Sequence, residues 1–424
     1  MKTNLIKAIL IPLLVFVVGC TNKSKKEVVI QEKQITAADI LGNADYLAIS
    51  YGGYRLKSRD SQPTIPQLKE DMKILSAMGI KIVRTYNVHL AQASNLLEAI
   101  SQLKKENSSF KMYVMLGAWI DCKNAFKGDN VKPDHNEESE RNAVEIESAV
   151  ALTNKYPDIV KIIAVGNEAM VKWATSYYVQ PGVILKWVNY LQDLKRNGNL
   201  PKDLWITSSD NFASWGGGSQ EYHVEDLNTL IKAVDYISMH TYPMHDTHYN
   251  PEFWGVLQDE NELSNIEKIE ASMLRAKEYA ISQYDSVVSY MTSIGINKPI
   301  HIGETGWASF SGGPYGNSGS KATDEYKEAL FYKHMREWTN KAGMSCFYFE
   351  AFDEQWKDAE NPLGSENHFG LFKLNGQAKY ALWNLVDKGI FKGLTRNGFS
   401  ITKTYNGNKE ALLEHVLVPP IKKN

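Results

Sequence analysis

Two stretches, IIAVGNEAM (residues 162–170) and PIHIGETGWAS (residues 299–309), decide the fold class. Each begins with a short apolar run that is typical of a buried strand, and each run breaks at a glycine just before a glutamate, Glu168 or Glu304. In a (β/α)₈ barrel, functional side chains lie at the carboxyl ends of the strands. Counting strands along the chain places these two glutamates at the ends of the fourth and seventh strands.

Similar runs recur along the chain. We expect strands at 45–52, 80–86, 111–118, 159–167, 204–209, 234–240, 299–304 and 344–350. Between them, apolar residues spaced near 3.6 predict helices at 66–78, 138–155, 182–196, 263–294 and 323–342. This alternation predicts an α/β fold, a (β/α)₈ TIM barrel. The alternative is an open doubly wound sheet, but residues 50–54 (SYGGY) lack its glycine-rich phosphate turn.

The N-terminus resembles a bacterial lipoprotein signal. Basic Lys2 and Lys7 precede an apolar stretch at 8–18, and VVGC (17–20) resembles a lipobox whose Cys20 becomes lipidated. A plain signal peptide is the alternative. Lipidation implies a membrane anchor at the outer membrane of a bacterial cell envelope, facing the periplasm or the surface. We expect a signal peptide at 1–20, a flexible tether at 21–40, the barrel at 41–387 and an extension at 388–424 that packs on the barrel.

Composition narrows the function classes. The chain has 424 residues, 43% of them hydrophobic, which suits one large domain. A net charge of −2 indicates no nucleic acid partner, and we expect a monomer. Cys122 and Cys346 lie in or near apolar runs on non-adjacent strands, so we expect core residues and no disulfide. No zinc-type Cys/His spacing occurs.

A metal site is the minor alternative for three histidines. His240, His245 and His248 follow one strand, but their spacing fits no single helix face. The chemistry that the two glutamates indicate needs no metal. We therefore expect no metal and no cofactor, with His240 bonded to sugar or to Glu304.

Two carboxylates facing one cleft are what glycoside hydrolysis requires. Glu168 would protonate the departing glycosidic oxygen, and the adjacent Asn167 would hydrogen-bond the sugar 2-OH. Glu304 would attack the anomeric carbon as a carboxylate in a retaining enzyme, after which Glu168 would act as base.

The last strand and the tryptophans supply candidate sugar ligands. FEAFDEQWK (349–357) follows the eighth strand, and its Glu354 and Lys357 could bind hydroxyls; a solvated loop with internal ion pairs is the alternative. Aromatic rings stack on sugar faces. Several tryptophans follow predicted strands, namely Trp119, Trp173, Trp215, Trp307 and Trp356. Of these, we expect Trp119, Trp215 and Trp307 to bind substrate and the rest to fill loop cores.

Five motifs in order resemble glycoside hydrolase family 17: RTYN (84–87), VGNEAM (165–170), HTYPMH (240–245), GETGWAS (303–309) and FEAFDEQWK. The resemblance covers about residues 45–385. It implies a (β/α)₈ β-1,3-glucanase that retains configuration, uses no metal, and has Glu168 as acid/base and Glu304 as nucleophile. The residues that it implies near the reacting sugar are Tyr86, Asn167, Tyr242, Glu354 and Lys357. Loops 119–137 and 243–262 look particular to this chain.

The expected function is therefore a lipid-anchored endo-1,3-β-glucanase acting on laminarin-type glucan. A β-1,3-glucanosyltransferase would use the same carboxylates, with an acceptor sugar replacing water. A non-catalytic glycan-binding lipoprotein is the alternative from another class. Such a protein typically loses one of the two acids, whereas this chain keeps both.

Overall fold

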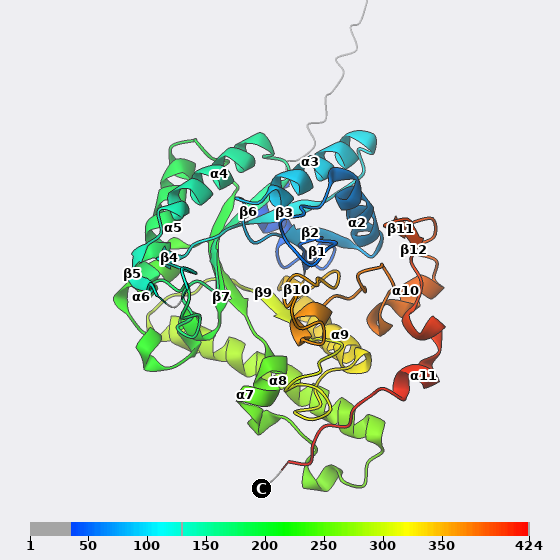
Figure 1. Ribbon diagram of the computed structural model, residues 1–424. Coiled ribbons are helices and arrows are strands. Elements are labelled where there is room, and N and C mark those ends of the chain that lie inside the picture. Colours follow the sequence, from blue (N-terminus) through cyan, green and yellow to red (C-terminus); the bar gives the residue numbers. More distant parts are fainter. Residues whose placement is uncertain (1–34, 129, 423–424) are drawn as a thin grey trace, which may run out of the picture. The chain divides into compact units, whose positions relative to one another are not determined.

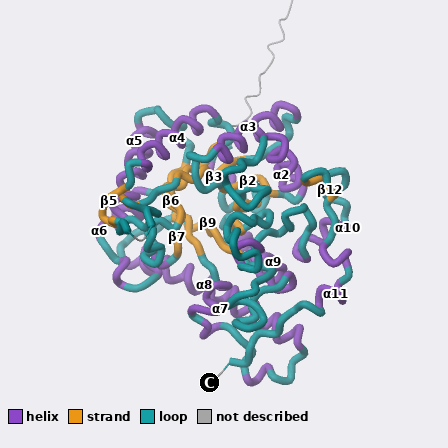
Figure 2. Tube along the Cα trace, in the orientation of Figure 1, coloured by secondary structure: helices purple, strands orange, loops and turns teal. Residues whose placement is uncertain are grey.

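The computed structural model describes residues 35–128 and 130–422, and eight parallel strands close into a barrel at its centre (Figures 1 and 2). Their order around the barrel is β1-β10-β9-β8-β7-β6-β3-β2. The strands are β1 (Leu47–Ser50), β2 (Ile80–Arg84), β3 (Tyr113–Ala118), β6 (Val160–Asn167), β7 (Trp205–Asn211), β8 (Ile237–His240), β9 (Ile300–Gly306) and β10 (Cys346–Phe349). The expected (β/α)₈ fold is confirmed.

Helices surround the barrel (Figure 1). The main ones are α2 (Ile65–Ala77), α3 (Ala91–Glu106), α4 (Arg141–Lys155), α5 (Pro181–Arg196), α6 (Glu225–Ala233), α7 (Pro243–Tyr249), α8 (Asn265–Ser293) and α9 (Glu325–Lys341). Helices α2 and α8 begin with capping boxes at Thr64 and Ser264, which satisfy backbone N–H groups that a helix start leaves free. The helix expected from residue 138 begins instead at Arg141. Residues Asp134–Glu138 form strand β5, which pairs with β4 (Cys122–Lys123).

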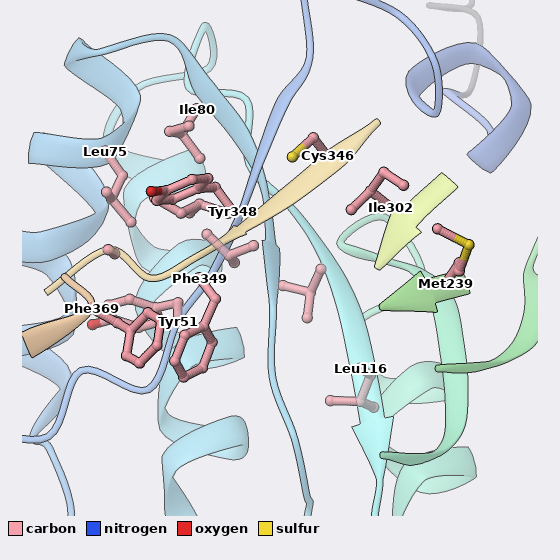
Figure 3. Close-up of a cluster of buried hydrophobic side chains, with 14 of the residues drawn as sticks. Tyr51, Leu75, Ile80, Leu116, Met239, Ile302, Cys346, Tyr348, Phe349 and Phe369 are labelled. Atoms are coloured by element: carbon pink, nitrogen blue, oxygen red, sulfur yellow. The ribbon is translucent and has the colours of Figure 1, made fainter. Parts of the chain in front are cut away.

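The core has two layers because successive side chains of a strand point to opposite faces. Ala48, Ile82, Met115, Ile162 and Phe347 form one buried cluster inside the barrel. Their chain neighbours, among them Ile49, Val83, Leu116, Ile163 and Tyr348, belong to a larger cluster that includes residues of the helices. Figure 3 shows part of this larger cluster, with Tyr348 of β10 near Leu75 of α2.

The folded part begins earlier than expected. Residues 35–40 were expected to belong to a flexible tether, but helix α1 (Ala37–Ile40) packs into the inner cluster with Ala37 and Ile40 fully buried. Its side chains cover apolar groups of the barrel strands, so the compact unit starts at Ile35. The expected signal peptide, Cys20 and residues 21–34 of the tether lie outside the described residues.

Residues 388–422 lie against the outside of the barrel, coloured orange to red in Figure 1. This part follows α10 (Trp383–Asp387) and contains β11 (Thr395–Arg396), β12 (Phe399–Ser400) and α11 (Lys409–Leu413). Buried Arg396 bonds Asp71 of α2 at 2.9 Å, and Phe391 and Leu412 join the core. Within residues 35–422, apart from 129, no helix combines the length and apolarity needed to cross a membrane.

Candidate active site

Glu304 lies buried near the carboxyl end of β9, surrounded by donors from other strands. The Tyr242 hydroxyl donates to its Oε1 at 2.6 Å, and the Tyr86 hydroxyl donates to its Oε2 at 3.0 Å. The Arg84 guanidinium pairs with the same Oε2. Burial raises the pKa of Glu304, but His240, Arg84 and the Tyr242 hydrogen bond outweigh burial and lower the pKa to about 2. Glu304 is therefore held as a carboxylate, the form that a nucleophile needs.

Arg84 joins the two motifs that carry the acids. It is the last residue of β2 and is 1% exposed. Besides Glu304, it donates to the Gly303 carbonyl at 3.0 Å and to the Asn167 side-chain oxygen. The sequence motif RTYN contained this arginine, yet only Tyr86 was assigned a role there. An arginine at the end of a mostly buried strand was the available signal, because a buried cation needs an anionic partner.

Glu168 follows β6 and is held by an irregular backbone. Gly166 and Glu168 both adopt positive φ, 81° and 46°, and the Glu168 N–H donates to the Ser209 carbonyl at 3.0 Å. A glutamate in this left-handed region is uncommon, and such backbone concentrates at functional sites. The side chain keeps 26% of its surface exposed, in contrast with buried Glu304. The two carboxylates thus differ in burial and in the side chains that contact them.

His240 and Asp210 hold Glu168 and the turn that follows it. From the sequence we had assigned His240 to other partners and missed Asp210. His240 Nδ1 lies 3.1 Å from Glu168 Oε1, and its Nε2 lies 2.7 Å from the Ser209 hydroxyl. We had expected His240 to bond sugar or Glu304. Asp210 accepts from the Met170 N–H at 2.7 Å, which fixes the turn after Glu168. Burial raises the pKa of Asp210 to about 7. Neither contact has a local sequence signature, since both join different strands.

The cleft has two halves that meet at Glu304 and Phe349. The first half, the Trp119 pocket, is lined by Tyr51, Gly52, Tyr54, Arg59, Tyr86, Asn87, His89, Gln92, Trp119, Asp121, Phe126, Arg141, Asn167, Tyr177, Glu354, Trp356 and Lys357. The second half, the Trp173 pocket, is lined by Glu168, Trp173, Asn211, Phe212, Ala213, Tyr242, His245, Asp246, Tyr249, Asn250, Glu366 and Phe369.

Most of the expected sugar ligands line this cleft. Tyr86, Asn167, Trp119, Glu354 and Lys357 face the Trp119 pocket, and Tyr242 faces the Trp173 pocket. Glu354 is fixed before any ligand arrives. It accepts from the Tyr54 N–H at 3.0 Å and from the Trp356 indole at 2.7 Å.

The Lys357 ammonium has an anionic partner and two aromatic ones. It lies 3.4 Å from Glu350 Oε2, 3.9 Å from the centre of the Phe349 ring and 5.3 Å from the centre of the Trp356 ring. Glu350 is buried, and burial raises its pKa well above its usual value. Asp353 of the same motif points elsewhere, because it accepts from buried Lys379 at 2.8 Å. In this motif, Glu354 and Lys357 thus line the cleft, whereas Asp353 bonds to a lysine in the interior.

For two tryptophans, the prediction that they bind substrate is wrong. Trp215 is fully buried and donates to the Ser238 carbonyl at 3.1 Å. Trp307 is also fully buried, packs on Trp254 and donates to the Ala322 carbonyl at 2.7 Å. Both rings belong to the larger core cluster. Trp173, 59% exposed, and Trp356 line the cleft instead.

The three histidines considered for a metal site point to different partners. His240 bonds Glu168 and Ser209, as described above. His245 stacks on the Tyr242 ring and lies 3.6 Å from Glu366, whereas His248 packs against Tyr249 and Tyr315. Among residues 35–422 other than 129, no three His, Cys, Asp or Glu side chains are grouped so that they could hold a metal ion. Cys122 and Cys346 are both buried free thiols.

A family comparison agrees with this geometry. The model of the BtgE/BtgC glycoside hydrolase domain matches residues 48–370, which span every barrel strand and both glutamates. The chain belongs to this family. The resemblance to glycoside hydrolase family 17 drawn from the five sequence motifs is confirmed, and the chain is a glycoside hydrolase by descent.

Solved structures place this family member among related barrels. The crystal structure of an endo-laminarinase from Formosa Hel1_33_131 is 71% identical, with a TM-score of 0.91, and covers 92% of this chain and 99% of that one. A family 17 β-1,3-glucanosyltransferase from Rhizomucor miehei is 20% identical, with a TM-score of 0.54 over 80% of this chain and 96% of that one. At that identity the likeness establishes the shared fold.

Curated fungal relatives are more distant. A glucan endo-1,3-beta-glucosidase of Emericella nidulans is 24% identical over 70% of this chain and 38% of its own length. A glucan 1,3-beta-glucosidase of Arthroderma benhamiae is 23% identical over 74% of this chain and 82% of its own length. This glycoside hydrolase spans about two fifths of the length of most of the curated relatives that it matches.

Proposed function

We propose that this glycoside hydrolase cleaves internal β-1,3 bonds of laminarin-type glucan with retention of configuration. The observation that carries the proposal is the contrast between its two acids. Glu304 is buried and held ionised by His240, Arg84 and the Tyr242 hydrogen bond, whereas Glu168 reaches the cleft and contacts His240 Nδ1. The likeness to the endo-laminarinase from Formosa Hel1_33_131 supports the choice of substrate and of internal cleavage.

The mechanism follows from where each group lies. Glu168 gives its proton to the glycosidic oxygen while a Glu304 oxygen attacks the anomeric carbon, so the bond to the leaving sugar breaks and a glycosyl ester forms. Glu168, now a carboxylate, removes a proton from water, and the resulting hydroxyl attacks the anomeric carbon and releases Glu304. Two inversions give retention. Asn167, whose side-chain oxygen accepts from Arg84, bonds the sugar 2-OH in this proposal.

The test is incubation with laminarin, with products sized over time. An endo-acting enzyme should shorten the average chain quickly and release a ladder of oligosaccharides, and proton NMR of early products should show the β anomer. Glu304→Gln should lose at least about 10³-fold in kcat because an amide cannot form the ester. Glu360→Gln, an exposed neighbour in sequence of the cleft motif, is the matched control. Release of glucose alone, or the α anomer, would contradict the proposal.

Transglycosylation is the second candidate function, and one feature favours testing it. Trp173 and Tyr249, 59% and 69% exposed, line the half of the cleft that contains Glu168, where an acceptor sugar could stack. At high oligosaccharide concentration, products longer than the substrate would indicate transfer. Their absence at every concentration would leave hydrolysis as the activity.

We further propose that Cys20 carries lipid and anchors the enzyme to the outer membrane. The support is the sequence VVGC at 17–20 after an apolar stretch, followed by the polar segment TNKSKKE before the barrel. Cys20→Ala should release active enzyme from the membrane fraction of expressing bacteria. Retention of that variant in the membrane through detergent-free washing would contradict the anchor.

A further inference from the structure

The position of Glu168 indicates which half of the cleft binds the leaving sugar. A general acid must reach the oxygen that joins the attacked sugar to the leaving sugar. Glu168 lines the Trp173 pocket, whereas Glu304 lines both halves. The leaving part of the substrate therefore occupies the Trp173 pocket. The sugar attacked by Glu304, and the sugars on its non-reducing side, occupy the Trp119 pocket.

Three aromatic rings stand together in the Trp119 pocket. We call Trp119, Phe126 and Tyr177 the ring cluster. The centres of the Trp119 and Tyr177 rings lie 5.2 Å apart, and Phe126 stacks on Tyr177 at 5.3 Å and 25°. The rings come from three separate segments: the loop after β3, the β4–β5 connection and the loop after β6. Their proximity is thus a product of tertiary structure.

Phe126 is unusual on two independent grounds. Its side chain is 57% exposed, although burying an aromatic ring is strongly favourable. Its backbone has φ 60°, in the left-handed region that costs free energy for a bulky residue. The Phe126 N–H bonds the Ser176 carbonyl at 3.2 Å, which ties this conformation to the loop that carries Tyr177. A strained backbone that displays a ring at a pocket is typical of a binding site.

Two residues that line the Trp119 pocket carry buried polar atoms without hydrogen-bond partners. Asp121 is 2% exposed; its Oδ2 accepts from the Trp119 indole at 3.3 Å and from Arg141 at 2.6 Å. Its Oδ1 is buried and has no hydrogen-bond partner. Gln92, 5% exposed, likewise has an unpartnered Nε2. Both residues line the Trp119 pocket, and buried polar groups are seldom left unpaired.

We propose that the ring cluster is a distal donor-side subsite for a β-glucosyl residue of the glucan chain. The sugar face stacks on Phe126 and Trp119, and its hydroxyls face the polar side chains of Asp121 and Gln92, which line the same pocket. The inference rests on the proposed function and adds what that function leaves open, namely which residues bind the glucan chain beyond the reacting sugar.

The test uses 4-nitrophenyl β-laminarioligosides with one to six donor sugars. Release of nitrophenol reports cleavage at one fixed bond, so the number of donor sugars is the only variable. For wild type, kcat/KM should rise when the donor becomes long enough to reach the ring cluster. Phe126→Ala should remove about 5- to 10-fold of that rise and leave the shorter glycosides unaffected, as expected for loss of one stacking contact. Phe399→Ala, at a 64% exposed phenylalanine of β12, is the matched control.

A second pair of variants separates binding from folding. Phe126→Leu keeps apolar volume without the ring and should show the same chain-length effect. In the Glu304→Gln background, Phe126→Ala should weaken binding of laminarihexaose but not of laminaribiose. An equal loss with every donor length, or no loss, would overturn the proposal. If wild type cleaves none of the laminarioligosides or laminarin while the protein is folded, the proposed function itself fails, and the subsite falls with it.

Discussion

Arg84 of β2 pairs across the barrel with Glu304 of β9, and the two residues are 220 positions apart in the chain. The guanidinium also bonds the Asn167 side chain, so one buried cation contacts both motifs of the site. A buried ion pair costs desolvation of both groups and is weak evidence for stability. Its consequence here is electrostatic, because it keeps a buried carboxyl ionised.

Arg84→Met should move the acid limb of the pH profile upward. With the pKa of Glu304 lowered to about 2, the carboxylate of wild type persists throughout ordinary acidic assays. Without the cation, less of the cost of burying a charged carboxylate is offset. The pKa of Glu304 therefore rises, and the nucleophile is protonated at higher pH. The measurement is kcat/KM from pH 3 to pH 8. Tyr86→Phe removes one neutral donor and should shift the limb less.

The same pair affects stability with a definite sign. A carboxyl whose pKa is lower in the folded than in the unfolded protein stabilises the fold above the unfolded pKa, which is about 4.3 for glutamate. That contribution is lost as pH falls from there through the folded pKa of about 2. Wild type should therefore lose more stability than Arg84→Met between pH 5 and pH 3. An acid limb and a stability profile unchanged by Arg84→Met would contradict this account.

Glu168→Ala should discriminate between leaving groups. Cleavage of laminarin needs a proton on the departing sugar oxygen, whereas a 2,4-dinitrophenyl group leaves without one. We expect a loss of about 10²-fold or more on laminarin and a much smaller loss of glycosylation rate on 2,4-dinitrophenyl β-laminaribioside, measured in the pre-steady state. Equal losses on both substrates would assign Glu168 to sugar binding alone.

Gly52→Ala should displace Glu354. A Cβ at Gly52 would lie 2.4 Å from Glu354 Oε1, closer than any ordinary contact, so the carboxylate must move away from the Tyr54 N–H. We expect kcat/KM on laminarin to fall by about 10-fold or more, because small displacements of positioned groups are costly. Gly313→Ala is the control, since its Cβ would have no neighbour nearer than 3.7 Å. Unchanged kinetics would mean that Glu354 takes no part in substrate binding.

Trp215→Ala should mainly lower stability, whereas Trp173→Ala should mainly lower activity. Trp215 is fully buried, so its truncation should lower the free energy of unfolding by about 3–5 kcal/mol. Trp173 is 59% exposed at the cleft, so its truncation should change stability by no more than about 0.5 kcal/mol and weaken activity on laminarin. Denaturant unfolding and laminarin kinetics measure both. A stability loss in Trp173→Ala comparable with that of Trp215→Ala would contradict these assignments.

The fold and the two acids could be predicted because their signals are local. Apolar runs separated by helical periodicity give the strand count, and a barrel strand places whatever follows it at one rim. Glu168 and Glu304 therefore needed only their own motifs and the count. The boundary at residue 41 failed for lack of such a signal, since four residues of α1 are too few to show a helical period.

The partners of these acids were decided by tertiary structure alone. Trp215 and Trp307 follow strands just as Trp119 does, yet their loops turn inward, and no local pattern distinguishes a ring that fills the core from one that lines a cleft. His240 meets Glu168 and Arg84 meets Glu304 because the closed barrel brings distant strand ends together. The sequence determined which groups stand at the rim. The direction in which each side chain points depends on packing against other segments, up to 220 residues away for Arg84 and Glu304, and that packing sets the charge of Glu304 and the shape of the cleft.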